Sequence, residues 1–108
     1  MDNLSIKAKV VYATMDKLGA INKENKITSY TILDYIIEES EELYKHPMLK
    51  EIPEEDFINL TLEINIKSIS AILTSLARKN LIIGTEATTI KVDGTNRNLK
   101  RYYLNIKK

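Results

Sequence analysis

Hydrophobic side chains recur at helical spacing in the third quarter of the chain. They occupy the i, i+3, i+4 and i+7 positions of one helical face: Ile69, Ile72, Leu73 and Leu76. Asn65 can cap the start of such a helix, because its side-chain oxygen can accept a hydrogen bond from a free backbone N–H. Asn80 can end it, because asparagine tolerates the left-handed backbone conformation. The pattern therefore predicts one amphipathic helix over residues 66–79.

The opposite face of this predicted helix is small, hydroxylated and basic, with no acidic residue. Its members are Lys67, Ser70, Ala71, Thr74 and Arg78. Lysine and arginine can pair with guanine, serine and threonine can bond to bases or phosphates, and an alanine methyl can touch thymine. Free N–H groups at the helix start, beside Asn65 and Ser68, can hold a phosphate. The face suits a DNA major groove, and the simpler interpretation is an ordinary solvated helix surface.

The hydrophobic period changes from helical to alternating after Asn80. Tyr102, Leu104 and Ile106 fall on one face of an alternating segment, and the sequence DGTNRN at 93–98 is a strong turn signal. The pattern predicts a two-stranded hairpin over about 81–107. Four cationic residues are expected near its tip: Lys91, Arg97, Lys100 and Arg101. Such a tip can lie along the DNA backbone or minor groove, or its charges can simply protect an exposed strand edge.

Three further helices are expected upstream. Apolar residues of helical period predict a helix over 4–18 that stops at Gly19, and another over 30–45. Pro53 followed by three acidic residues predicts a short helix over 54–61, after a loop at 46–53. A very short edge strand is expected at 26–29.

The run from Leu62 to Ile82 resembles the second half of a winged helix-turn-helix domain, as in MarR-like proteins and the winged-helix modules of phage and plasmid replication proteins. The matching residues are Leu62, Ile64, Asn65, Ser68, Ile69, Ser70, Leu76, Lys79, Asn80, Leu81 and Ile82. The resemblance implies a recognition helix over 66–79 and a wing over 81–107. Either 30–45 or 54–61 could be the first helix of the helix-turn-helix, and the interpretation preferred from sequence is 30–45. The expected fold is thus mainly α with a small β-hairpin (α+β), one domain over 1–108 with three to four helices and a two-stranded wing.

Charge is distributed unevenly along the chain, although the formal net charge is only +1. Residues 1–60 contain 7 Lys and 12 Asp or Glu, a net charge of −5. Residues 61–108 contain 9 Lys or Arg and 3 acidic residues, a net charge of +6. Phosphate contact depends on the local patch rather than on the total. The polarity favours a DNA-binding C-terminal half, whereas the simpler interpretation is two solvated surfaces that differ in sign.

Several other functions find no support in the residues. Cysteine is absent, His46 is the single histidine and is expected to be exposed and inert, and only three glycines are present. The acids at 38–42 and 54–56 lack the spacing of a calcium loop. We therefore expect no enzyme, no cofactor and no metal site. No apolar run reaches the length of a membrane span, and the start MDNLSIKAK lacks the apolar centre of a secretory signal, so a cytoplasmic protein with no membrane contact is expected.

These patterns together predict a sequence-specific double-stranded DNA-binding protein that regulates transcription. A homodimer is expected, because two-fold symmetry doubles the length of the site that is recognised, with the 4–18 helix as part of the dimer surface. One alternative is an accessory protein that binds an origin in plasmid or phage replication or transfer. Another is a protein-interaction module whose acidic N-terminal half binds a basic partner.

Overall fold

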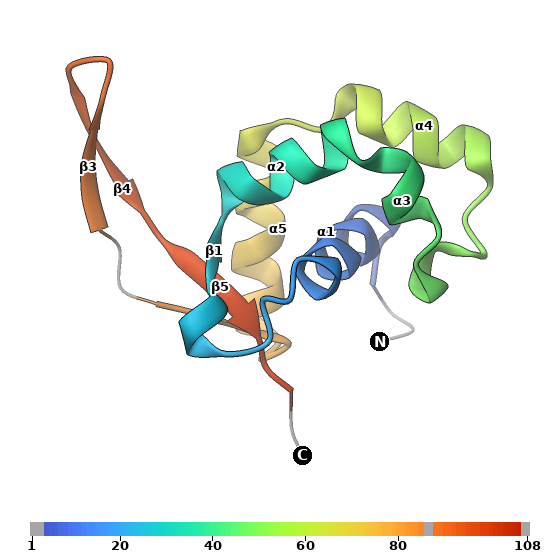
Figure 1. Ribbon diagram of the computed structural model, residues 1–108, viewed down its shortest axis with the longest axis horizontal. Helices are drawn as coiled ribbons and strands as arrows, with labels where there is room; N and C mark the ends of the chain where they lie inside the picture. Colours follow the sequence, from blue (N-terminus) through green and yellow to red (C-terminus); the bar gives the residue numbers. More distant parts are fainter. Residues whose placement is uncertain (1–3, 86–87, 107–108) are drawn as a thin grey trace.

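A computed structural model describes residues 4–85 and 88–106 of the chain. This part is mainly helical, with a small antiparallel sheet and a β-hairpin that projects away from the helices (Figure 1). The α-helices are α1 (Ile6–Lys17), α2 (Ser29–Glu38), α3 (Ser40–Tyr44), α4 (Glu54–Glu63) and α5 (Ile66–Arg78), and the 3-10 turns are η1 (Lys23–Asn25) and η2 (Pro47–Leu49). The strands are β1 (Ile27–Thr28), β2 (Ile82–Gly84), β3 (Thr88–Val92), β4 (Thr95–Leu99) and β5 (Arg101–Leu104). The predicted α+β class is confirmed.

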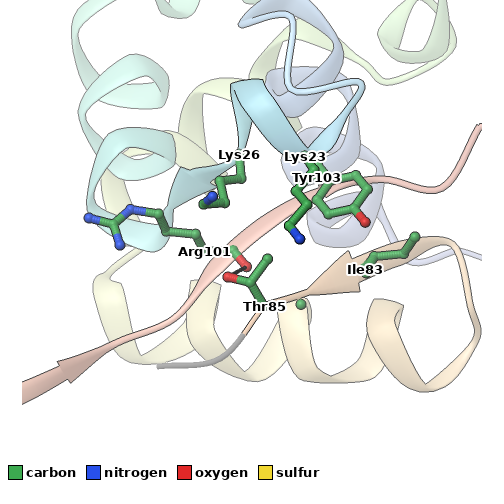
Figure 2. Close-up of a pocket in the computed structure, with 7 residues that line it drawn as sticks. Lys23, Lys26, Ile83, Thr85, Arg101 and Tyr103 are labelled. Carbon is green, nitrogen blue, oxygen red and sulfur yellow. Dashed lines mark hydrogen bonds between the residues drawn. The ribbon is translucent and has the colours of Figure 1, made fainter. Parts of the chain in front are cut away.

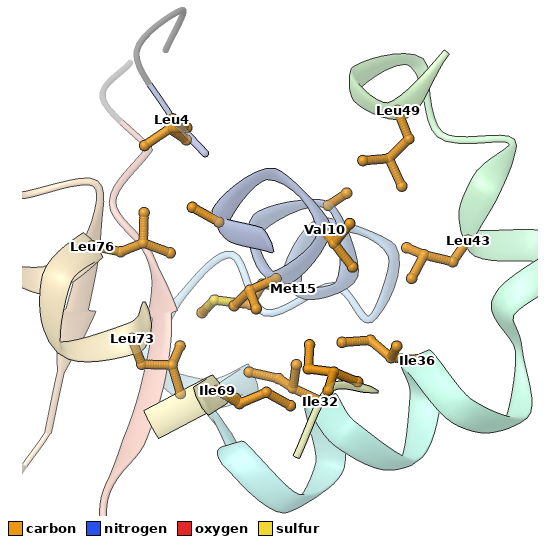
Figure 3. Packing of buried hydrophobic residues seen from close by; sticks show 14 of the residues in the cluster. Leu4, Val10, Met15, Ile32, Ile36, Leu43, Leu49, Ile69, Leu73 and Leu76 are labelled. Carbon is orange, nitrogen blue, oxygen red and sulfur yellow. The ribbon is translucent and has the colours of Figure 1, made fainter. Parts of the chain in front are cut away.

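Helix α1 runs through the middle of the hydrophobic core. Figure 3 shows Val10 and Met15 of α1 between side chains of the other helices, and both are fully buried. Ser5 caps the helix start, with the N–H of Ala8 donating to its Oγ at 3.1 Å. Gly19 ends the helix at a φ of +73°, a conformation in which glycine carries no Cβ penalty. The predicted helix over 4–18 and its stop are therefore confirmed to within two residues.

The predicted helix over 30–45 is wrong as a single element, because it breaks at Glu39. The backbone there has a φ of −121° and a ψ of 33°, outside the helical region, and α3 starts immediately afterwards. Leu43 of α3 is fully buried in the core, whereas Ile37, near the end of α2, remains 57% exposed. Leu43 is seven residues after Ile36, so helical period alone places both on one face and does not reveal the break at Glu39.

The predicted loop at 46–53 packs tightly against the core. Leu49 is fully buried and Ile52 is 5% exposed, and the hydroxyl of Tyr44 donates to the backbone carbonyl of Ile52. His46 is also buried, at 9% exposure, with its Nε2 2.7 Å from Oδ2 of Asp16. The expectation of an exposed histidine is therefore wrong, because a contact 30 residues away in sequence covers the ring.

Helices α4 and α5 form a bent pair joined by only two residues, Ile64 and Asn65. Their axes differ in direction by 110°. Helix α4 starts directly after Pro53 as predicted and runs two residues past the expected end at 61. Helix α4 directly precedes α5 in the sequence, whereas α2 packs against α5 and supplies Ile32 to the core beside it (Figure 3). The preference for 30–45 over 54–61 as the first helix stays a prediction.

The sheet brings together strands that lie far apart in the sequence. Strand β5 is central, with β1 and β2 antiparallel on either side of it. Strand β3 pairs with β4, and Val92 opposite Thr95 closes a two-residue turn at Asp93 and Gly94. Both turn residues have positive φ, +51° and +76°, as in a type I′ hairpin turn. The predicted edge strand is confirmed. The predicted two-stranded hairpin over 81–107 is confirmed in part, because β3 and β4 form a hairpin with a shorter turn than the expected 93–98, whereas β2 and β5 pair in a different sheet.

Candidate nucleic-acid interface

The start of α5 is held by reciprocal hydrogen bonds between Asn65 and Ser68. The N–H of Ser68 donates to Asn65 Oδ1 at 2.9 Å, and the N–H of Asn65 donates to Ser68 Oγ at 3.1 Å. The Ser68 hydroxyl also donates to the backbone carbonyl of Asn65 at 2.9 Å. This capping box satisfies the backbone at the helix start. Two predicted DNA contacts, Asn65 and Ser68, therefore use these side-chain atoms to position the helix.

The end of α5 is tied to the sheet. Asn80 takes a φ of +60°, and the N–H of Leu81 donates to the carbonyl of Leu76 at 3.1 Å, which closes the helix in a Schellman motif. The side-chain amide of Asn105 donates to the Asn80 carbonyl at 2.8 Å. The predicted stop at Asn80 is confirmed, and α5 is held at this end relative to the last strand.

The predicted contact face of α5 lies on the surface. Its five members are all exposed: Lys67, Ser70, Ala71, Thr74 and Arg78. Ile69 and Leu73 on the other side are fully buried, so the helix cannot rotate without breaking the core. The hydroxyl of Thr74 donates to the Ser70 carbonyl at 3.0 Å, which leaves its oxygen to accept bonds from outside. The face offers cations at both ends and small groups between them.

The four predicted wing cations do not form one cluster at the tip. Lys91 is exposed on β3, one residue from the pair that closes the turn. Arg97 is opposite Ile90 in the hairpin, and its side chain lies outside the described side chains. Lys100 and Arg101 are at the other end of the hairpin, about 20 Å from the turn at roughly 3.3 Å per residue. Antiparallel pairing separates these residues, although they are close in sequence.

Lys100 packs against the wing base. Its Nζ lies 5.9 Å from the centroid of the Tyr102 ring, a cation–π distance. A Cβ at Gly84 would come within 2.8 Å of Lys100 Cε and 3.0 Å of a Tyr102 ring carbon, so glycine makes room for this packing. Burial raises the pKa of the Tyr102 phenol above its ordinary value. Lys100 and Tyr102 thus pack together over Gly84 of β2.

A basic groove lies on the outer face of the three-stranded sheet (Figure 2). It has a volume of about 550 Å³ and is lined by Lys23, Lys26, Ile83, Gly84, Thr85, Arg101 and Tyr103. Lys23 and Lys26 belong to the acidic half of the sequence, so the comparison of charge between halves concealed them. Pairing of β1 with β5 places Thr28 opposite Arg101. It thereby brings the segment that contains Lys23 and Lys26 to the base of the wing. Only a prediction that β1 pairs with β5 would have placed Lys23 and Lys26 at this groove from the sequence.

Other kinds of site receive limited support. Within residues 4–85 and 88–106, no group of three or more His, Asp or Glu side chains is arranged to hold a metal ion. No single helix there is long and apolar enough to cross a membrane, and the α4–α5 pair reaches the required length and composition only with its 110° bend. Comparison of the chain with protein-family models, with curated proteins and with solved structures gives no match.

Proposed function

We propose that the protein is a winged helix-turn-helix domain that binds double-stranded DNA site-specifically. In this proposal α5 enters the major groove, and the β3–β4 hairpin is the wing that lies along the backbone or minor groove. The observation that carries the proposal is the exposed face of α5, with Lys67 and Arg78 near its ends and Ser70 and Thr74 between them. An α-helix of this kind fits the width of the major groove, and its side chains can reach base edges.

The order and geometry of the elements support the proposal. The 110° turn between α4 and α5 is typical of helix-turn-helix pairs. Strand β2 follows α5 after three residues, and the hairpin that comes next returns through β5 to the same sheet. Both ends of α5 are capped, by Asn65 and by Asn80, so the helix is rigidly placed. A rigid recognition element loses little conformational entropy when it binds.

The local charge around α5 also supports the proposal. The helix carries no acidic residue, and its basic residues Lys67 and Arg78 are exposed, as is Lys79 directly after it. Lys91 near the wing tip adds a further exposed cation. Contacts of this kind release counterions from DNA, so the affinity should fall steeply with salt.

A cytoplasmic transcriptional regulator that acts as a homodimer is the role we propose, and origin binding in plasmid or phage replication or transfer is the alternative. Two copies would read two half-sites and double the length of the recognised sequence. Helix α1 has few residues to offer to a dimer surface, because Val10, Val11 and Met15 are fully buried. Ile6, in its first turn, is 42% exposed and remains available.

Selection of duplexes from a random pool, followed by titration of the recovered sequence, tests DNA binding. We expect enrichment of a defined motif, and an affinity that falls by orders of magnitude between about 50 and 200 mM salt. A matched pair of variants distinguishes contacts made by the face of α5 from a general attraction by charge. Arg78→Ala should reduce the enrichment by weakening binding of the recovered sequence by about 1–3 kcal/mol, whereas Lys50→Ala, at an exposed position outside α5 and the wing, should leave it unchanged. Absence of any complex at low salt would overturn the proposal.

One structural feature favours a protein-interaction module as a second candidate. A groove of about 200 Å³ between α3 and α4 is lined by Ser40, Glu41, Tyr44, Glu54, Phe57 and Ile58. Two carboxylates beside apolar side chains suit a basic peptide with a hydrophobic anchor. Saturable binding of Lys-rich hydrophobic peptides that is lost in Glu41→Gln/Glu54→Gln, together with absence of DNA binding, would favour this candidate.

A further inference from the structure

Helices α2 and α4 each carry large apolar side chains outside the core. These side chains recur at i, i+3 and i+7 on α2 and at i and i+4 on α4, so each set follows one side of its helix. The members are Tyr30, Leu33 and Ile37 on α2, and Ile58 and Leu62 on α4. Leu62 is 79% exposed and Ile37 is 57% exposed, whereas Leu33 is half-buried. A contiguous set of such side chains marks an interaction surface, although single ones are ordinary.

The two apolar sets lie beside each other. Helices α2 and α4 are in contact and run in opposite directions (Figure 1). Ile58 and Ser40 both line the α3–α4 groove. Leu62 is four residues further along α4 and Ile37 is three residues before Ser40, so at about 1.5 Å per residue both lie about 5–6 Å beyond the groove on the same side. The five apolar residues thus form one apolar strip that begins at the groove and follows α2 and α4.

The helices that carry the apolar strip are strongly acidic. Residues 29–63 contain 2 Lys and 10 Asp or Glu, a net charge of −8. Glu42 forms ion pairs with Lys17 and Lys45, and in the part of the chain that the structure describes these are the only ion pairs made by the acids of 29–63. Glu41 and Glu54 line the groove itself. An occupant of this surface must therefore combine apolar side chains with positive charge.

We propose that the apolar strip and the α3–α4 groove together bind a cationic amphipathic helix of a partner protein. Such a helix lays side chains at i, i+3, i+4 and i+7 into an apolar groove, and its lysines and arginines would face the carboxylates of α2–α4. A second copy of this chain suits the surface less well, because two-fold pairing brings like charges together. An anionic membrane is disfavoured for the same reason.

This assignment rests on the second candidate function, whose α3–α4 groove it extends along α2 and whose partner it specifies. It is independent of DNA binding by α5. The exposed face of α5 shares no residue with the apolar strip or with the groove, so one molecule could hold DNA and the partner helix together.

Titration of ¹⁵N-labelled protein with designed helical peptides, monitored by amide chemical shifts, tests the proposal. The probe contains two copies of the sequence LKKLLKL, whose leucines form one face of a helix with lysines on the other. A scrambled peptide of the same composition lacks that face, and a third peptide has glutamate in place of lysine. We expect saturable shifts at Ile37, Ile58 and Leu62, with an affinity at least about tenfold above that of either control peptide.

Matched variants separate the apolar strip from other exposed apolar side chains. Ile37→Ser/Leu62→Ser should lower the affinity for the LKKLLKL probe by about tenfold or more, because two anchoring contacts are lost. Ile6→Ser/Ile21→Ser changes two exposed isoleucines outside α2–α4 and should have no effect. The same spectra report whether each variant is folded.

A second matched pair tests the role of charge. Glu41→Gln should weaken binding of the LKKLLKL probe several-fold at low salt, because it removes a carboxylate that lines the groove. Glu24→Gln removes the same charge at an exposed position in η1 and should leave the affinity unchanged.

Four results would overturn the proposal. Equal affinity for the scrambled peptide would reduce the interaction to a general attraction by charge. Dimerisation in sedimentation velocity that Ile37→Ser/Leu62→Ser abolishes would assign the apolar strip to a second copy. Binding of phosphatidylglycerol vesicles that the same variant loses would assign it to a membrane. Probe binding that needs Glu41 but survives Ile37→Ser/Leu62→Ser would overturn the extension along α2 and leave the second candidate function standing.

Discussion

His46 and Asp16 join two segments of the chain that lie 30 residues apart, with Nε2 of the histidine 2.7 Å from Oδ2 of the aspartate. The other ring nitrogen, Nδ1, accepts a hydrogen bond from the N–H of Met48 at 3.1 Å. Because Nδ1 accepts, a neutral ring carries its proton on Nε2 and donates it to Asp16. The ring thereby holds η2 against the last turn of α1.

Removal of this histidine should destabilise the fold. His46→Ala eliminates both hydrogen bonds and opens a cavity under η2, so we expect the free energy of unfolding to fall by about 1–3 kcal/mol. Urea denaturation followed by circular dichroism measures the change. A double-mutant cycle with Asp16→Asn isolates the contact, and a coupling energy near zero would show that it does not contribute. Asp34→Asn, at an exposed position on α2, is the matched control.

Two serines on α5 should separate stability from binding. Ser68→Ala breaks the capping box and should cost about 1 kcal/mol of stability. Ser70→Ala removes an exposed hydroxyl and should leave stability unchanged or slightly higher, because alanine has the better helix propensity. If α5 contacts DNA, Ser70→Ala should weaken specific binding without changing the melting temperature. Equal melting temperatures for the two variants would contradict the role of the cap.

Gly84 should not accept a side chain. In Gly84→Ala the new Cβ would meet Lys100 Cε at 2.8 Å and the Tyr102 ring at 3.0 Å. Lys100 is flexible and can move, but the buried ring cannot, so we expect a loss of about 1–3 kcal/mol. Gly84→Ala/Lys100→Ala should recover part of this loss in thermal melts. Full recovery would mean that only the lysine was displaced.

Specific and general DNA contacts should respond differently to mutation. Lys67→Ala and Arg78→Ala should each weaken binding to the selected sequence by about 1–3 kcal/mol relative to binding to random DNA. Lys91→Ala and Arg97→Ala should weaken binding to the selected sequence and to random DNA alike. Each should also reduce the slope of log affinity against log salt concentration by about one. Fluorescence anisotropy at several salt concentrations measures both effects. If all four variants lost affinity equally for the selected and for random DNA, base contacts by α5 would be contradicted.

Stability should fall in alkaline solution through the buried tyrosines. Burial raises the pKa of Tyr102 above its usual 10.0. The pKa of Tyr12 is also raised, mainly by burial and to a smaller extent by the negative charge of Asp16. Each raised pKa adds stability that is complete below about pH 10 and is lost as the pH rises through the folded-state value. Tyr102→Phe should reduce the loss of unfolding free energy between pH 8 and 12, measured by denaturation at each pH. An unchanged profile would show that Tyr102 does not titrate in this range.

Local pattern was sufficient to predict much of the secondary structure. Asn65, Gly19 and Asn80 are capping residues whose preferences depend on a few neighbouring backbone groups, so they marked helix ends correctly. The exposed face of α5 followed in the same way, because helical period alone determines which side chains oppose the apolar stripe. The role of that face in DNA binding stays a prediction.

Contacts between distant segments decided the rest. Nothing near His46 in the sequence indicates Asp16, and nothing near Lys23 indicates Arg101, because both relationships arise when α1 and β5 pack against other elements. The break at Glu39 is likewise absent from the local pattern, because the helical period continues across it from Ile36 to Leu43. Local sequence thus determined where most helices begin and end. Long-range packing determined which side chains meet, since that depends on chain folding over tens of residues.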